Sequence, residues 1–391
     1  MKKLILVSFF VVLFPTKIFV FLNILHRFAT SSCNTLFFYN MKQFKTMLAV
    51  AAAAMLFSSC NGKKDDPEGP DVKHDVEIPE VIFESYYVGD YYETETSANA
   101  FMNFISGNVD MNEDETDYIG DGQILCLDVN IALPASVEEA DHLIIPAGTY
   151  NVGDDTHAPL TWNPADSYLI KVENDVVLVD EMEFKSGTIV VEKTEKGSKI
   201  VFNGVLKNDT EFSYEYEGVD RLMNHADDSK YSNLDKNIEV GNLAGASYSS
   251  LGDVVGDGKT ETWVISLADK YYDFEKDYGN GESVMLYLNV ANGATEIPEG
   301  KITEFADLNV TESLEPNTFV AGLFMYGLYG GCWYKCPANA YEAAIIGGEV
   351  EIKKVDETKY SISGTLREAY GKTVTFSYEG EVAKMEYNEI D

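Results

Sequence analysis

The sequence predicts an all-β protein with two tandem homologous domains, each an antiparallel β-sandwich, with a calycin-like barrel as the alternative. Three observations lead to this prediction. Residues 188–193 and 199–202 alternate apolar and polar side chains over strand-length runs. Tight turns rich in Gly, Asn and Asp, such as 196–198 and 256–258, separate such runs at short intervals. Finally, a series of landmarks recurs later in the chain, in the same order and at a nearly constant offset.

These landmarks indicate a tandem duplication. The Ile-Pro-x-Gly turn at 145–148 recurs at 297–300, and the strand at 202–206 recurs at 362–366 with an offset of 160. A further match joins Phe212–Gly218 to Phe376–Gly380 near the end of each copy. The duplication predicts that the two halves superpose, with Gly204 over Gly364 and Pro146 over Pro298.

The N-terminal region contains a complete lipoprotein signal peptide over residues 41–59. Lys42 and Lys45 supply the positive n-region, and the apolar run 47–57 is too short to span a bilayer stably. Ser58 and Ser59 then precede Cys60, which we expect to be cleaved and acylated there. The lipid on Cys60 would attach the protein to a membrane.

The remaining boundaries follow from composition. We interpret residues 1–40 as an extension upstream of a start at Met41, with a membrane helix over 4–25 as the alternative. Residues 60–78 are polar and Pro-rich and predict an extended tether. Residues 79–219 and 239–391 form the two predicted β domains. The polar segment 220–238 between them is the predicted interdomain linker.

Charge limits the possible partners. The whole chain has a net charge of −36, and residues 1–59 contain six Lys or Arg and no Asp or Glu, so the rest carries −42. A nucleic acid would be repelled, whereas cationic ligands, divalent cations and neutral glycans stay possible. The chain has 24 Tyr and 21 Phe, too many aromatic residues for an acidic disordered tail.

The motifs of common enzymes do not occur in the chain. It has no Gly-x-Ser-x-Gly elbow, no His-Glu-x-x-His and no phosphate-binding glycine loop, so we predict a protein that is not an enzyme and needs no cofactor. Cysteines are too few for a disulfide scaffold. Cys332 and Cys336 could bridge, bind a metal or stay reduced.

One acidic segment superficially follows the ligand order of a calcium loop. Its candidate ligands are Asp110, Asn112, Asp114 and Asp121. Glu115 stands where such a loop needs glycine, and no helices flank the segment, so a solvated hairpin loop is the favoured interpretation. Calcium binding by these four residues is the alternative.

Aromatic residues in Gly-rich or loop-like segments are the candidate ligand-binding residues. They are Trp162 in the first copy and Tyr329, Trp333 and Tyr334 in the second. Exposed rings of this kind can stack on sugars or form protein contacts. The alternative is that they fill the core between the sheets, which is the commoner fate of such rings.

The lipobox cysteine followed by Lys63-Lys64-Asp65-Asp66 resembles the export signal of surface-exposed lipoproteins of Bacteroidetes. The Ile-Pro-x-Gly turns and the Phe-x-Tyr-x-Gly strands are similar to those of β-rich domains in uncharacterised lipoproteins of that phylum. The resemblance implies an outer-membrane, surface-exposed location and brings no active site with it.

From these observations we predict a non-catalytic lipoprotein that acts in binding or adhesion at the cell surface, with a glycan or a protein as ligand. The alternative is a glycan-binding accessory lipoprotein of a polysaccharide-uptake system. A glycan-active hydrolase is the least favoured of the three.

Overall fold

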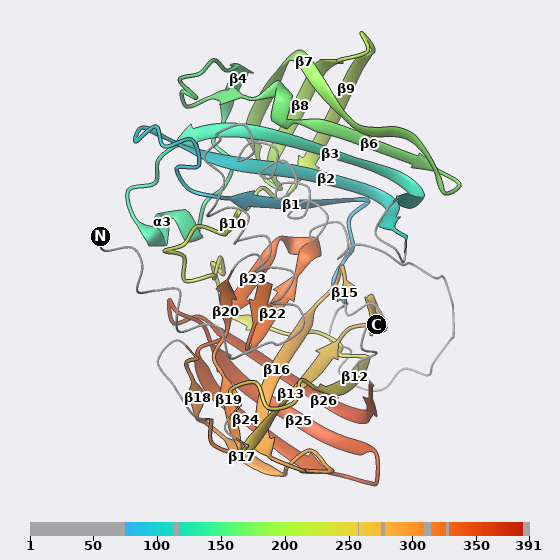
Figure 1. Ribbon diagram of the computed structural model, residues 1–391, viewed down its shortest axis with the longest axis vertical. Helices are drawn as coiled ribbons and strands as arrows, with labels where there is room; N and C mark the ends of the chain where they lie inside the picture. Colours follow the sequence, from blue (N-terminus) through green and yellow to red (C-terminus); the bar gives the residue numbers. More distant parts are fainter. Residues whose placement is uncertain are drawn as a thin grey trace, which may run out of the picture.

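Two curled β-sheets account for most of the described chain, one built from its first half and the other from its second half (Figure 1). The computed structural model describes residues 75–112, 117–256, 258–274, 278–308, 314–325 and 328–385. The predicted all-β class is confirmed, because one helix and two 3-10 turns are the only helical elements within these ranges. None of the described helices is long and apolar enough to cross a membrane.

The first sheet has ten strands and encloses one hydrophobic core. We call this sheet with its helical elements the first body. It consists of β1 (Val81–Tyr87), β2 (Ser97–Met111), β3 (Tyr118–Ala132), α3 (Val137–Asp141), β4 (Gly148–Val152), β5 (Thr161–Trp162), η1 (Pro164–Asp166), β6 (Tyr168–Glu173), β7 (Val176–Thr194), β8 (Gly197–Leu206), β9 (Glu211–Gly218) and β10 (Met223–Asn224). The strand order is β10-β1-β2-β3-β5-β4-β7-β8-β9, and β6 pairs with β3 and β7. The two end strands of this order, β9 and β10, are consecutive in the chain and joined by a short link, so the sheet curls until its ends lie close together. Phe83 of β1 stacks on Tyr216 of β9 across the core.

The second sheet has twelve strands and curls in the same way. We call this half of the described chain the second body. It consists of β11 (Ile238–Glu239), β12 (Gly245–Ser250), β13 (Thr260–Ala268), β14 (Tyr272–Asp273), β15 (Tyr278–Gly279), β16 (Ser283–Ala291), β17 (Gly300–Ile302), β18 (Phe305–Ala306), β19 (Thr318–Val320), β20 (Leu323–Met325), β21 (Leu328–Gly330), β22 (Trp333–Cys336), η2 (Pro337–Asn339), β23 (Tyr341–Ala344), β24 (Gly347–Lys354), β25 (Lys359–Arg367) and β26 (Thr373–Lys384). Of these strands, β14 with β15 and β20 with β21 form two separate two-stranded sheets. The path runs β17-β24-β25-β26-β12-β13-β16-β19-β18, so its two end strands are again consecutive in the chain.

Each body contains an asparagine–threonine pair, and the two pairs make the same hydrogen bonds. In the first body Asn130 lies opposite Thr161, and its Nδ2 donates to Thr161 Oγ1 over 2.9 Å. In the second body Asn289 lies opposite Thr318, and its Nδ2 donates to Thr318 Oγ1 over the same 2.9 Å. Each threonine hydroxyl donates in turn to the carbonyl three residues before it. These repeated contacts support the predicted duplication, whereas the superposition of Gly204 on Gly364 and of Pro146 on Pro298 stays a prediction.

The predicted linker 220–238 packs against both bodies along part of its length. Within 220–238, Leu222 and Leu234 are fully buried, and Met223 and Asn224 form β10, which pairs in parallel with β1. Ser232 bridges to Ala343 of β23. Asn224 and Asn233 bond to buried partners, whereas Asp227 and Asp228 are exposed, so the polarity of the segment does not by itself mark mobility.

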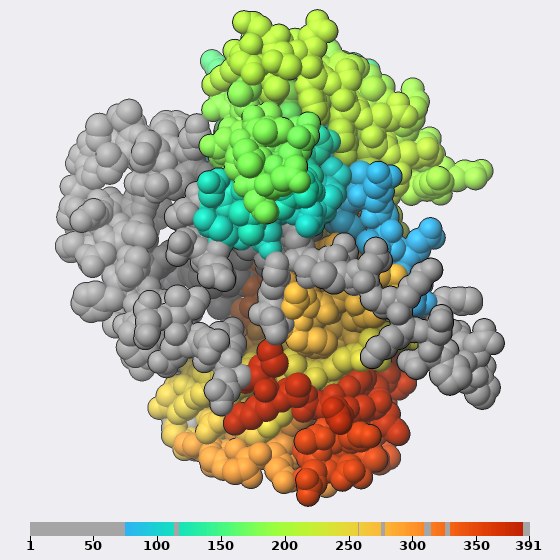
Figure 2. Space-filling model, turned by 90° about the vertical axis from the view of Figure 1, so that its right-hand side faces the viewer, coloured from blue at the N-terminus to red at the C-terminus, as the bar shows by residue number. Residues whose placement is uncertain are grey.

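The end of the predicted tether is also held in place. Asp75 forms an ion pair with Lys270 and accepts a hydrogen bond from Asn242 Nδ2. Val76 and Ile78 pack against the core of the second body. The rest of the tether, Cys60 and the signal peptide lie outside the described residues. Figure 2 shows the two bodies, green above and orange to red below, stacked along the long axis of the molecule.

Candidate functional site

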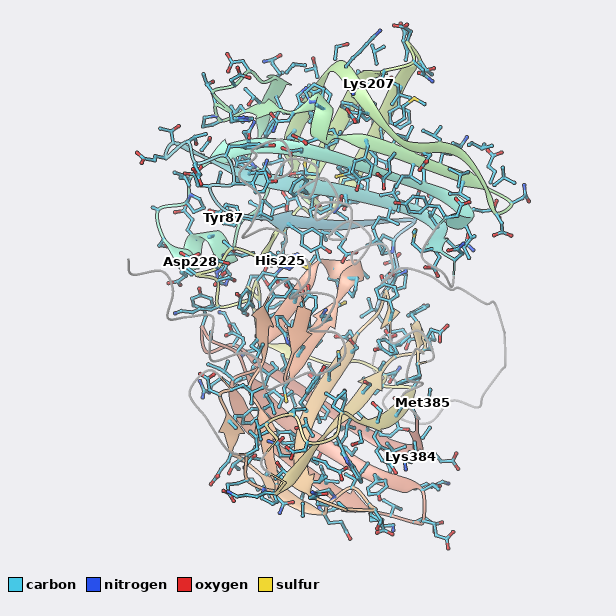
Figure 3. All side chains as sticks on the ribbon, viewed as in Figure 1. Tyr87, Lys207, His225, Asp228, Lys384 and Met385 are labelled. Carbon is cyan, nitrogen blue, oxygen red and sulfur yellow. The ribbon has the colours of Figure 1, made fainter. Side chains whose placement is uncertain are left out.

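A polar junction joins the two bodies, and it is built from segments far apart in the sequence. Glu84 and Tyr86 come from β1, His225 follows β10, and Glu342 lies on β23 of the second body. Figure 3 places Tyr87, His225 and Asp228 together at this junction, between the two sheets. We call the residues Glu84, Tyr86, His225, Tyr329, Lys335 and Glu342 the junction cluster.

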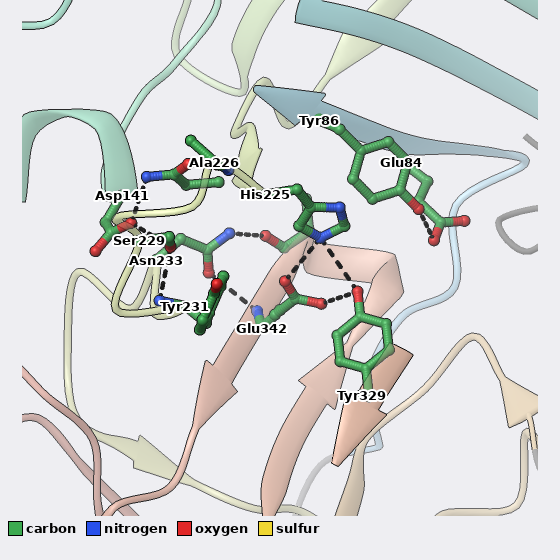
Figure 4. A network of polar contacts seen from close by, with 12 residues as sticks. Glu84, Tyr86, Asp141, His225, Ala226, Ser229, Tyr231, Asn233, Tyr329 and Glu342 are labelled. Atoms are coloured by element: carbon green, nitrogen blue, oxygen red, sulfur yellow. Dashed lines mark hydrogen bonds and ion pairs between the residues drawn. The ribbon is translucent and has the colours of Figure 1, made fainter. Parts of the chain in front are cut away.

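Glu342 is the centre of the junction cluster (Figure 4). Its carboxylate accepts a hydrogen bond from the Tyr329 hydroxyl over 2.6 Å and lies 3.4 Å from His225 Nε2. Its backbone N–H donates to Asn233 Oδ1 over 2.9 Å. Burial opposes the ionisation of Glu342, but the hydrogen bond and charge of His225 together with the charge of Lys335 lower its pKa. Glu342 is therefore held as a buried carboxylate with cationic neighbours.

The ring of His225 is packed between aromatic rings of both bodies. Its centroid lies 4.5 Å from that of Tyr86 and 4.3 Å from that of Phe324. The Nδ1 atom of His225 is buried and has no hydrogen-bond partner. Lys335 Nζ lies over the Tyr329 ring, 3.0 Å from its centroid, which places a cation beside the hydroxyl that binds Glu342.

Glu84 differs from Glu342 in its protonation. Its Oε1 accepts a hydrogen bond from the Tyr86 hydroxyl over 2.5 Å, whereas its Oε2 is buried without a partner. Burial raises the pKa of Glu84 to about 7, although the Tyr86 hydrogen bond and the Lys335 charge oppose the rise. Near neutral pH one carboxyl of the junction cluster is therefore charged and the other is partly protonated.

A second anchor at the junction is Asp141, at the end of the five-residue helix α3. Ser136 caps the start of this helix by accepting from the Glu139 N–H over 3.1 Å. The Asp141 side chain is fully buried and accepts from Asn224 Nδ2, Ser229 Oγ and the Lys230 N–H at 2.6, 2.7 and 3.0 Å. Its Oδ2 also accepts from the Tyr370 hydroxyl of the second body over 2.5 Å. One carboxylate thus orders the segment 220–238, called the connecting segment below, and ties it to both bodies.

An open depression lies beside the junction cluster. It is lined by residues 87–90 of the first body and 225–228 of the connecting segment. Three of these residues are aspartates. Asp227 and Asp228 are exposed, and the Asp90 carboxylate accepts from the N–H groups of Thr94 and Glu95 at 2.7 and 2.8 Å. The depression therefore presents negative charge to solvent, and a cationic group is the chemistry that it would accept.

Three of the four aromatic candidates from the sequence are core residues. Trp162 is 0% exposed, and Trp333 and Tyr334 are each 1% exposed. Trp162 packs edge-on against Phe184 and Phe202, and its Nε1 donates to the Gly187 carbonyl over 3.2 Å. The proposed sugar-stacking role of these three rings is therefore wrong for this structure, because other side chains cover their faces. Tyr329 is partly exposed as a residue, but its hydroxyl donates to Glu342.

The candidate calcium loop also gains no support from its described residues. Asp110 lies opposite Ile119 in the β2–β3 hairpin, and the Asp121 carboxylate accepts from the N–H of Asn174. Asp114 lies outside the described residues. Nowhere in the described ranges do three or more His, Cys, Asp or Glu side chains converge to hold a metal. Cys332 and Cys336 are free, buried thiols, and burial raises the pKa of each to about 12.

Replacement of Glu84 by glutamine tests the protonation of the junction. The raised pKa means that the folded protein binds more protons at Glu84 than the unfolded chain between pH 4.5 and about 7. The contribution of this group to stability is thus fully present below pH 4.5 and is lost as the pH rises through about 7. Glu84→Gln should remove this loss, which is on the order of 2 kcal/mol between pH 5 and pH 8. Denaturant unfolding of the wild type and of Glu84→Gln at pH 5 and pH 8 measures this change in the free energy of unfolding.

The exposed Glu351, which pairs with Lys353, offers the control. Glu351→Gln should keep the pH dependence of the wild type. If Glu84→Gln also keeps it, Glu84 is already ionised at pH 5 and the argument for its protonation fails.

Comparison with protein-family models, with curated proteins and with solved structures finds no match to this chain. Its function is therefore inferred from its own residues.

Proposed function

We propose that this chain is a non-catalytic lipoprotein that acts in binding or adhesion at the cell surface, anchored in the outer membrane through an acylated Cys60. The observation that carries the proposal is the acidic depression formed by residues 87–90 and 225–228. It lies beside a buried polar junction, so its two walls are held in fixed positions. A preformed site loses little conformational entropy when a partner binds.

The charge of the depression favours a partner with a basic group. Asp227 and Asp228 are exposed on one wall and Asp90 lies on the other. A Lys or Arg side chain of a partner protein would meet opposite charge there, within a chain whose net charge is already −36. Such complementarity raises the rate of association and selects among partners. We therefore favour a protein ligand over a neutral glycan.

The double variant Asp227→Asn/Asp228→Asn tests this site. Cells that display the full chain should lose roughly tenfold in retention on immobilised basic proteins, because each neutralised carboxylate weakens the electrostatic attraction. Asp155→Asn/Asp356→Asn is the matched control, since both of its aspartates are exposed and lie outside the depression. Its retention should equal that of the wild type.

Two further arms address the anchor and the alternative function. Cys60→Ala should abolish incorporation of labelled fatty acid and release the protein from the cells.

An array of neutral glycans tests the accessory glycan-binding function, and glycan capture that is unaffected by the aspartate variants would favour it. Equal retention of the aspartate variant and its control on basic proteins would contradict the proposed contact.

A further inference from the structure

The β6–β7 hairpin lies at one side of the first body (Figure 1), and it leaves an edge of the sheet without a neighbouring strand. β7 pairs with β6 from Val176 to Glu183, but β8 joins the other side of β7 only from Phe184 onward. Within the ranges that the structure describes, no strand pairs with this other side over residues 176–182. The outward N–H and C=O groups of these residues can therefore bond to an added strand.

The corresponding edge of the second body is covered. β3 pairs with β5 and β6 in the first body, and β16 pairs with β19 and β22 in the second. β6 then pairs with the first part of β7, as β22 pairs with β23. The outer side of β23 therefore corresponds to the outer side of β7 over residues 176–182.

An extended piece of the connecting segment occupies the outer side of β23. Ser232 forms an antiparallel bridge with Ala343. The Asn233 N–H donates over 3.1 Å to the carbonyl of the residue before Ala343, and the N–H of the residue after Ala343 donates over 2.8 Å to the Tyr231 carbonyl. This edge of the fold thus accepts a short extended segment, and main-chain hydrogen bonds hold it there.

The open edge of β7 also exposes apolar side chains. Val176 is 57% exposed and Leu178 is 51% exposed. Val177 and Val179, in contrast, pack against buried clusters, so the strand itself is held in place. Two shifts in the β6–β7 register add twist to this edge, which limits an added strand to a few residues.

Acidic residues surround the exposed pair. Glu173 and Asp175 precede Val176, Asp180 follows Leu178, and all three acidic residues are exposed. A second copy of this chain, with its net charge of −36, would bring like charge to the edge, and so would the acidic tether. A partner strand with basic side chains beside apolar ones would meet opposite charge.

We propose that residues 176–182 of β7 are a docking edge for an extended strand of a partner protein, in which apolar side chains alternate with Lys or Arg. The backbone of the partner completes the edge of β7, as residues 231–233 complete that of β23. Its apolar side chains cover Val176 and Leu178, and its basic side chains lie beside the acidic residues. The edge shares no residue with the acidic depression, so this contact and the proposed function can fail separately.

The test uses the full chain, solubilised in detergent, and a peptide of alternating Val and Lys as the probe. Amide hydrogen exchange is followed as the peptide is added. Exchange of the outward N–H groups in residues 176–182 should be fast in the free protein and at least roughly tenfold slower at saturation, because the added strand accepts from them. The fully N-methylated peptide keeps the side chains but cannot donate, so it should protect these groups at least roughly tenfold less.

Val176→Lys/Leu178→Lys should abolish this protection, because it replaces the apolar contact with like charge. Both residues are exposed, so the variant should keep the wild-type thermal midpoint. Val355→Lys, at a position of the second body that is 55% exposed, is the matched control and should leave the protection unchanged.

Asp227→Asn/Asp228→Asn separates the edge from the depression and should also leave the protection of residues 176–182 unchanged. The proposal is overturned if millimolar peptide does not slow exchange in residues 176–182, or if the N-methylated peptide slows it equally. Protection that survives Val176→Lys/Leu178→Lys, or that is lost in Val355→Lys or in the aspartate variant, also overturns it.

Discussion

Replacement of Asp141 by alanine is expected to destabilise the protein by roughly 3–5 kcal/mol, because it leaves one buried donor and three partly buried donors without an acceptor. These donors are Asn224 Nδ2, Ser229 Oγ, the Lys230 N–H and the Tyr370 hydroxyl. Hydrogen bonds to a charged acceptor are the stronger kind, and here one carboxylate serves both bodies. Denaturant unfolding measures the loss, and limited proteolysis should show new cleavage between residues 225 and 232.

Two comparisons make this expectation specific. Asp155→Ala, at an exposed position, should change stability by less than about 0.5 kcal/mol. Tyr370→Phe removes one donor from the second body and should cost about 1 kcal/mol. An Asp141→Ala protein that unfolds at the wild-type denaturant concentration and resists protease equally would show that the connecting segment is held by other contacts.

Replacement of Trp162 by alanine is expected to unfold the first body rather than to remove a ligand contact. The ring is 0% exposed and packs against Phe184 and Phe202, so its truncation leaves a large cavity in the core. Such a change costs about 3–5 kcal/mol. Thermal unfolding monitored by circular dichroism should show the loss as a lower midpoint.

The second body provides the matched variant. Phe319 lies opposite Leu288, as Trp162 lies opposite Val129, and it is also fully buried. Phe319→Ala should therefore destabilise to a similar degree, and Trp162→Phe should cost much less than Trp162→Ala because it preserves most of the packing. If Trp162→Ala keeps wild-type stability but loses retention on glycans, the ring is accessible and the stacking role must be restored.

The sequence predicted what depends on local pattern. Alternating side chains and tight turns are properties of neighbouring residues, so the all-β class could be read from them. Local pattern does not reveal which face of a strand is covered. For this reason the sequence could not decide whether Trp162 and Trp333 lie in the core or at the surface.

The junction could not be predicted, although one sign was present. Tyr370 lies 229 residues from Asp141, and His225 lies 117 residues from Glu342, so only tertiary pairing brings them together. A charged residue inside an apolar run was the available sign. Glu342 stands between Tyr341 and Ala343, and Asp128 stands between Leu127 and Val129. A carboxylate in such a place is either exposed or held by buried partners, and local pattern cannot decide which.

By itself the sequence determined the all-β class, the division into two halves and the expectation of an anchor at Cys60, since each rests on patterns within a short stretch of chain. Only the tertiary structure decided that the segment 220–238 is ordered, that Trp162, Trp333 and Tyr334 are core residues, and that separate carboxylates meet distant donors. The physical reason is burial: the same polar side chain is mobile in water and fixed where the fold surrounds it with partners.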